Sequence, residues 1–170
     1  MPKKIVFLDF EASRCGATIL LLRFLRWLKA NTDIPFEVVF RRGGELEDEF
    51  SKLAQVHVLN RAGAAKPSLL KRAAGHTGLK SKLYPGLLKK LSGKYERQDI
   101  LFYCNTVGNG GLLQHFSGPV RPVITHVHEL EYSIQCVGME TFNQVKAHTG
   151  HYIAVSDAVR NNLLFNHGIP

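Results

Sequence analysis

This sequence is short of the features that define several large classes of protein. Its three cysteines, Cys15, Cys104 and Cys136, are odd in number and lack the CxxC spacing of metal or redox motifs, so we expect reduced thiols in a cytosolic compartment. No apolar run reaches the ~20 residues of a membrane span. Asp9 and Glu11 interrupt the first apolar segment, which argues against a signal peptide. The remaining composition, 45% hydrophobic and 21% charged over 170 residues, is typical of one globular domain.

Signature motifs of common nucleotide-binding and hydrolytic enzymes are also missing. The chain has no GxGxxG fingerprint, no GxxxxGK[ST] phosphate loop and no GxSxG elbow, which disfavours a dinucleotide-binding motif, a P-loop and a serine hydrolase. In their place the loop "EASRCGAT" joins the first apolar run to a helical pattern. Gly16 would let a ligand approach the backbone, and the N–H groups of Arg14, Cys15, Gly16 and Ala17 would suit a phosphate or carboxylate at a helix start. The alternative is a simple tight turn.

Acidic residues are absent from residues 66–94. This segment holds eight Lys or Arg, as many positive charges as the net charge of +8 for the whole chain. Such a patch suits an anionic membrane surface, a phosphorylated ligand or nucleic acid, or is simply a solvated basic surface. Few aromatic residues accompany the cations, which argues against nucleic acid. The candidate membrane or anion patch consists of Lys71, Arg72, Lys80, Lys82, Lys89 and Lys90.

Short apolar runs alternate with helical patterns along the chain. The apolar runs predict strands over residues 3–10, 36–40, 56–59, 99–106, 122–128 and 151–156. Helical periodicity or capping signals predict helices over residues 17–30, 43–54 and 139–148, and a last helix between Ser156 as N-cap and Gly168 as C-terminal residue. We expect two short helices in the basic segment, broken at Gly75, Gly78 and the turn 84–86. This alternation predicts an α/β, doubly wound, mainly parallel sheet with helices on both faces.

Ligands of such a sheet bind at the carboxyl ends of its strands. The predicted topology places the loop 11–16, Asn105 onward, His128–Tyr132 and Ser156 along that rim. The segment "FYCNTVGNGGLL" supplies amide and hydroxyl groups that could bind a polyhydroxylated ligand, or it forms a flexible turn. The candidate sugar-binding residues at this rim are Asn105, Thr106, Asn109 and Ser156.

The stretch "VITHVHELEYSI" delivers His126, His128 and Glu129 at the end of a strand-like run. Period-two alternation places both imidazoles on one strand face and Glu129 on the other. Two histidines spaced in this way could begin a zinc site, which would still need a third protein ligand. Alternatively, His126 is a structural histidine and His128, at the strand end, faces a ligand.

Two motifs together resemble the N-terminal half of family 4 glycosyltransferases: "ITHVHELEYSI", and "YIAVSDAVRNNLLFNHGIP" about twenty residues later. The N-terminal "IVFLDF" followed by "GA" and a leucine-rich helix adds to this resemblance. The resemblance implies a GT-B architecture, in which residues 1–170 form a single Rossmann-like, acceptor-side domain and a C-terminal donor-binding domain is absent from this chain. It also implies retaining, metal-independent transfer of a sugar from a nucleotide-sugar to a glycan or lipid-linked acceptor, with no cofactor beyond the nucleotide-sugar co-substrate.

The resemblance further implies roles for particular residues. The loop Arg14–Ala17 would lie near the donor phosphates, and His128 or His126 would line the donor-sugar site, with Glu129 as a third catalytic candidate. The isolated half would be inactive, and a cytoplasmic enzyme with this basic segment would sit at the inner face of the cell membrane. Two alternatives remain: a stand-alone basic module that binds an anionic membrane or ligand, and a metal-dependent hydrolase that uses His126 and His128.

Overall fold

The computed structural model describes residues 3–60, 79–96, 98–116 and 122–170, and within 79–84 the backbone alone. Its six-stranded sheet has the order β3-β2-β1-β4-β5-β6, with every neighbouring pair parallel. The strands are β1 (Lys4–Glu11), β2 (Phe36–Arg42), β3 (Gln55–Asn60), β4 (Ile100–Cys104), β5 (Val123–Val127) and β6 (His151–Ala154). The order reverses between β1 and β4, which is the arrangement of a Rossmann-like fold and confirms the predicted fold class.

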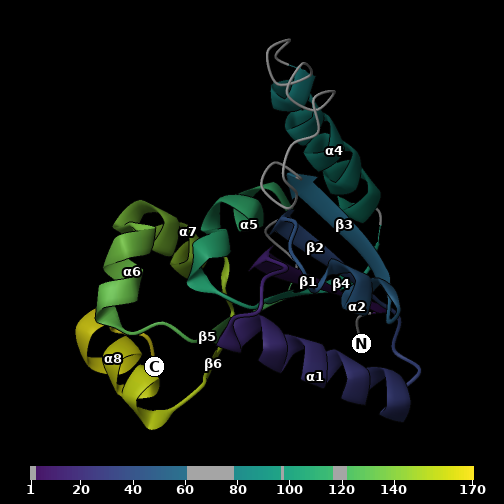
Figure 1. The fold of residues 1–170 in the computed structure, drawn as a ribbon. Helices are drawn as coiled ribbons and strands as arrows, with labels where there is room; N and C mark the ends of the chain where they lie inside the picture. The colour runs from purple at the N-terminus through teal and green to yellow at the C-terminus, as the bar shows by residue number, and fades with distance from the viewer. Residues whose placement is uncertain (1–2, 61–78, 97, 117–121) are drawn as a thin grey trace.

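Helices cover both faces of this sheet (Figure 1). They are α1 (Gly16–Asn31), α2 (Glu47–Ser51), α4 (Leu79–Glu96), the 3-10 turn η1 (Val107–Asn109), α5 (Gly110–Phe116), α6 (Glu131–Val137), α7 (Met139–His148) and α8 (Asp157–His167). The buried side chains of α1 and α2 pack on one face, whereas those of α4, α5, α7 and α8 pack on the other. The central strands are therefore buried on both faces.

The strand β1 shows why the apolar runs are continuous rather than alternating. Val6 and Leu8 are fully buried in the core under α4 and α5, and the intervening Phe7 is fully buried in the core under α1. A parallel strand covered by helices on both sides needs apolar residues at every position. A polar residue in such a run, as at Asp9, therefore needs a specific explanation.

The ends of α8 follow the local chemistry of the sequence. The Ser156 hydroxyl oxygen accepts a hydrogen bond from the backbone N–H of Val159, and Gly168 closes the helix in the left-handed region with φ of 62°. A serine N-cap and a glycine at the C-terminus satisfy helix-end backbone groups without strain. Both predictions are confirmed.

The predicted break at residues 84–86 is wrong, because α4 runs through Pro85 as a single helix. An internal proline removes one backbone hydrogen bond and usually ends or kinks a helix. Here the following turns are fixed by burial of Leu88, Leu91 and Tyr95 in the core, so tertiary packing outweighs the local cost. The predicted breaks at Gly75 and Gly78 lie outside the described residues.

Other boundaries differ from the predictions in ways that affect the functional rim. The helix predicted over 43–54 is limited to α2, and the helices α5 and α6 were not predicted. The strand predicted to extend to residue 106 ends at Cys104, so Asn105 and Thr106 leave the sheet. Thr106 then caps η1, because its hydroxyl oxygen accepts a hydrogen bond from the backbone N–H of Gly108 at 3.1 Å.

The glycine that begins α5 allows this helix to approach α7 closely. A Cβ atom at Gly110 would lie 2.0 Å from the backbone oxygen of Thr141 in α7, which no side chain tolerates. At the next position, Gly111, an added Cβ would meet its nearest neighbour, the Oε1 atom of Gln144, at 3.8 Å, an ordinary contact. Only glycine at position 110 therefore permits this packing of α5 on α7.

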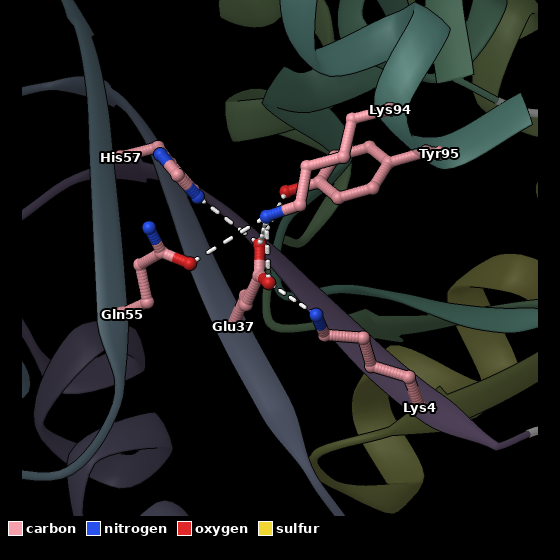
Figure 2. Close-up of polar contacts among 6 residues, drawn as sticks. All are labelled: Lys4, Glu37, Gln55, His57, Lys94 and Tyr95. Atoms are coloured by element: carbon pink, nitrogen blue, oxygen red, sulfur yellow. Dashed lines mark hydrogen bonds and ion pairs between the residues drawn. The ribbon is translucent and has the colours of Figure 1, made fainter. Parts of the chain in front are cut away.

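At the other end of the sheet, a buried carboxylate connects three strands and a helix. Glu37 of β2 is 4% exposed and accepts hydrogen bonds from Lys4 of β1, from Lys94 of α4 and, at 3.0 Å, from the Tyr95 hydroxyl, with the His57 ring of β3 also 3.0 Å away (Figure 2). Burial acts to raise the pKa of Glu37, but hydrogen bonds from Lys4, Lys94 and His57 outweigh it and lower the pKa to about 2. The ionised carboxylate therefore holds the C-terminal end of α4 on the sheet.

Candidate functional site

A cavity of about 560 Å³ opens beside the carboxyl ends of β1 and β4. This is the point where the strand order reverses, so loops leave on opposite faces and a crevice forms between them. The residues that line the cavity come from the start of α1, the turn after β4, and the helices α6 and α7, among others. Its charged and hydroxyl-bearing lining residues are Asp9, Glu11, Thr18, Arg41, Thr106, Glu129 and Thr141.

Asp9 brings a carboxyl group to the floor of this cavity although only 2% of the residue is exposed. Its Oδ1 atom accepts a hydrogen bond from the backbone N–H of Phe10 at 2.8 Å, and its Oδ2 atom accepts one from Asn105 Nδ2 at 3.2 Å. Burial raises the pKa of Asp9 to about 7, aided by repulsion from Glu129, whereas the hydrogen bonds from Phe10, Thr18 and Asn105 act in the opposite direction. This carboxyl group can therefore exchange a proton near neutral pH.

Glu129 is the second carboxylate of the cavity. It accepts a hydrogen bond from the Thr106 hydroxyl through Oε1 and from the backbone N–H of His128 at 2.9 Å through Oε2. These two contacts fix the side chain where it lines the cavity, beyond the end of β5 at Val127. Carboxylates held in this way can accept hydrogen bonds from the hydroxyl groups of a ligand.

His126 and His128 lie together on the α1 face of the sheet, with ring centroids 4.1 Å apart. His126 Nδ1 is 2.9 Å from the Tyr103 hydroxyl, and His128 Nε2 is 3.3 Å from Asn105 Oδ1. Burial, together with the neighbouring His128, lowers the pKa of His126 to about 4, and burial also lowers the pKa of His128. His126 is therefore neutral at pH 7, and burial favours the neutral form of His128. Neither ring is among the described residues that line the cavity.

A metal site at these histidines would need further ligands. Within the part of the chain that the structure describes, no group of three His, Cys, Asp or Glu side chains is arranged to hold a metal ion. One nitrogen of each ring is already engaged, by Tyr103 and Asn105 respectively. The arrangement fits two hydrogen-bonded imidazoles better than a pair of metal ligands.

The three candidate residues in the turn after β4 lie in different environments. Asn105 is 1% exposed and lies between Asp9 and His128, hydrogen-bonded to both. Thr106 lines the cavity. Asn109 is completely buried and donates a hydrogen bond to the backbone oxygen of Leu8 at 3.3 Å. This bond connects η1 to β1, which is a structural role. The sequence left two alternatives for this segment, a ligand-binding turn and a flexible turn, and the structure forms η1 and α5 from it.

Only some residues of the predicted phosphate loop lie at the cavity. Cys15 and Ala17 line the cavity, and Gly16 is exposed with open space around it at the start of α1. Arg14 is instead engaged with α2, where its guanidinium lies 3.3 Å from Glu49 and 3.8 Å from Glu45. The cation that does line the cavity is Arg41, whose guanidinium carbon is 5.4 Å from the centre of the Phe10 ring.

Ser156 and the basic patch lie apart from this cavity. Ser156 caps α8 and lines a separate hollow with Asp157 and Arg160. Of the basic patch, Lys89 and Lys90 are exposed on α4, and no helix in the described part of the chain is long and apolar enough to cross a membrane. Of the remaining patch residues, Lys80 and Lys82 belong to α4 without described side chains, and Lys71 and Arg72 fall outside the described residues.

Sequence reasoning missed several residues of the site, including Asp9, Thr18, Arg41, Tyr103 and Thr141. Asp9 gave one signal, because a carboxylate within the apolar run "IVFLDF" is unexpected in a strand buried on both faces. The others belong to helices or strands whose patterns carry no local sign of a site. No model of a known protein family matches this chain, and neither does any curated protein.

Proposed function

We propose that this chain is the acceptor-side domain of a retaining GT-B glycosyltransferase, which moves a sugar from a nucleotide-sugar to a glycan or lipid-linked acceptor. The observation that carries the proposal is the cavity at the β1/β4 reversal, lined by Asp9, Glu11, Thr106 and Glu129. Carboxylates and hydroxyl groups are the usual partners of sugar hydroxyls. The resemblance of the "THVHELEY" and "AVSDAVRNNL" segments to family 4 glycosyltransferases supplies the reaction class.

The donor phosphates would lie at the start of α1. The first N–H groups of an α-helix have no partner within the helix, and the helix dipole favours negative charge there. Gly16 leaves this end open, and Arg41 adds a cation to the same cavity. In this proposal Arg14 keeps the loop in place through its ion pairs with α2, while Arg41 meets the anionic group.

His128 does not line the cavity, so in this proposal the transferring sugar would extend past the cavity to the His128 ring, beyond the end of β5, and exchange a hydrogen bond with it there. Burial lowers the pKa of His128 and so favours its neutral form, and its contact with Asn105 holds the ring in position. A hydrogen bond that strengthens as charge develops on the sugar lowers the barrier of transfer. Glu129, fixed by Thr106, would hold an acceptor or sugar hydroxyl on the other side.

The experiment uses the enzyme that contains this domain together with its nucleotide-sugar-binding partner domain. Labelled UDP-, GDP- and ADP-hexoses are offered with glycan and lipid-linked acceptors, and transfer is followed for the wild type, His128→Ala and Glu129→Gln. We expect the wild type to transfer one of these sugars, and we expect each variant to lose at least about tenfold in rate with an unchanged circular dichroism spectrum. Asn31→Ala, at the far end of α1, serves as the matched surface control.

Absence of transfer from every nucleotide-sugar, or an unchanged rate in both variants, would refute the proposal. Residues 1–170 alone should bind a ligand without turning it over, because in this proposal a single Rossmann-like domain supplies only one side of the GT-B cleft and the leaving group is oriented from the other side. Turnover by this chain alone would count against the view that it is half of an active site.

A further inference from the structure

Asp9 is a buried carboxyl group of the cavity lining, and the proposed function does not explain its contacts within the chain. It sits at the carboxyl end of β1, beneath the cavity, and its two oxygens accept hydrogen bonds from Phe10 and Asn105. Burying a carboxyl group at 2% exposure costs free energy unless its partners are well placed. A residue kept at that cost next to a candidate site calls for a functional explanation.

The partners of Asn105 determine which way its amide points. Its Nδ2 atom donates to Asp9 Oδ2 at 3.2 Å and to the backbone oxygen of Ala17, also at 3.2 Å. If the amide were turned over, its oxygen would face the Ala17 carbonyl oxygen, and two acceptors would be opposed. The Oδ1 atom of Asn105 is therefore the atom that faces His128 Nε2, at 3.3 Å.

An acceptor at this position selects the protonation pattern of the imidazole. A neutral histidine carries one ring proton, and a nitrogen that faces an amide oxygen makes a hydrogen bond only if it holds that proton. His128 must therefore hold its proton on Nε2, which leaves Nδ1 as an unprotonated acceptor. The neighbouring His126 ring, engaged through Nδ1 with Tyr103, does not compete for Asn105.

We propose that Asp9 is a positioning residue, which acts through Asn105 to hold His128 in the Nε2–H tautomer. The three side chains come from the ends of β1, β4 and β5 and form one hydrogen-bonded series across the β1/β4 reversal. His128 then offers an acceptor nitrogen, Nδ1, in a fixed ring orientation. The catalytic consequence rests on the proposed function, whereas the choice of tautomer is a property of this chain alone.

Nuclear magnetic resonance of the chain with ¹⁵N-labelled histidine tests the tautomer directly, since the two ring nitrogens have distinct shifts when protonated and unprotonated. We expect a single Nε2–H tautomer for His128 in the wild type at pH 8. Asn105→Leu removes the acceptor and should give a mixture of both tautomers. In Asp9→Asn the new amide oxygen still accepts from the Phe10 N–H, so the new NH₂ group faces Asn105 Nδ2 and two donors are opposed. Only the Ala17 carbonyl then resists reversal of the Asn105 amide, and the Nδ1–H fraction should rise at least several-fold.

A control separates this effect from general loss of stability. Glu37→Gln alters the other buried carboxylate at the opposite end of the sheet and should leave the His128 tautomer unchanged. A wild type with Nδ1–H, or an Asp9→Asn variant with the wild-type tautomer, would overturn the proposal. If Asp9→Asn does not fold, Asn105→Leu still decides whether the amide controls the ring, and an unchanged tautomer there also overturns it.

Activity gives a second and separable readout in the transferase. Asp9→Asn should lower kcat by about tenfold and leave KM for the nucleotide-sugar within about twofold, because a partner that orients a reacting group affects the transition state more than binding. A tautomer change without any effect on transfer would count against the proposed role of His128 and leave the Asp9–Asn105–His128 relation intact. An unchanged tautomer with a normal rate would reject the relation itself.

Discussion

Replacing Asp9 by Asn should change the pH dependence of stability in a calculable way. The pKa of Asp9 is raised from 3.8 to about 7 in the folded chain. The unfolded chain therefore releases this proton near pH 4, whereas the folded chain keeps it until about pH 7. The unfolded state binds fewer protons between these values, so the group contributes stability below pH 4 that is lost as pH rises towards 7.

The magnitude follows from the width of that interval. Between pH 5 and pH 6 the wild type loses about 1.4 kcal/mol of unfolding free energy per pH unit through this group. The loss per unit decreases as the pH passes the folded pKa, so the total from pH 5 to pH 8 is about 2.5 kcal/mol. Asn has no proton to release, so this contribution disappears in Asp9→Asn.

Urea unfolding at pH 5 and pH 8, followed by circular dichroism, measures the difference. The free energy of unfolding of the wild type, relative to that of Asp9→Asn, should fall by about 2.5 kcal/mol between the two pH values. The matched control is Asp33→Asn, the same chemical change at an exposed position, which should run parallel to the wild type. Parallel behaviour of Asp9→Asn and wild type would refute a carboxyl group that is protonated near neutrality.

Three further changes test the packing and the surface. Gly110→Ala should lower the free energy of unfolding by about 1–3 kcal/mol, because the added Cβ would overlap the α7 backbone. The control Gly111→Ala should be neutral or slightly stabilising in thermal unfolding, and equal effects of the two variants would contradict the packing argument. Glu37→Gln should lower the free energy of unfolding by about 3 kcal/mol at pH 7, because folding lowers the pKa of Glu37 from 4.5 to about 2. This stabilisation is present above pH 4.5 and is lost as the pH falls towards 2, so a difference in stability between variant and wild type that persists in acid would exclude this origin. The double variant Lys89→Glu, Lys90→Glu should bind vesicles of acidic lipid at least about tenfold more weakly at low salt in sedimentation, because each cation near such a surface contributes about 1 kcal/mol of binding free energy. If the wild-type chain stays in the supernatant, the predicted membrane binding is wrong.

The sequence determined the six strands and the ends of α8 because their signals are local. Apolar runs marked the six strands, and the hydroxyl of Ser156 and the glycine at 168 marked the ends of α8, since backbone hydrogen bonding and left-handed φ depend on residues a few positions apart. The shared face of His126 and His128 followed from strand periodicity alone. Doubly wound topology followed from the alternation of strands and helices.

The tertiary structure decided the site, because the site depends on which strands are neighbours. Asp9 and Asn105 are 96 positions apart and contact each other because β4 pairs with β1. The spacing of these residues in the sequence therefore does not predict the contact. The same applies to Glu37, whose partners come from two other strands and from α4. The course of α4 through Pro85 was likewise settled by burial of the turns that follow it, since packing free energy shared among many distant residues exceeds the local preference of one.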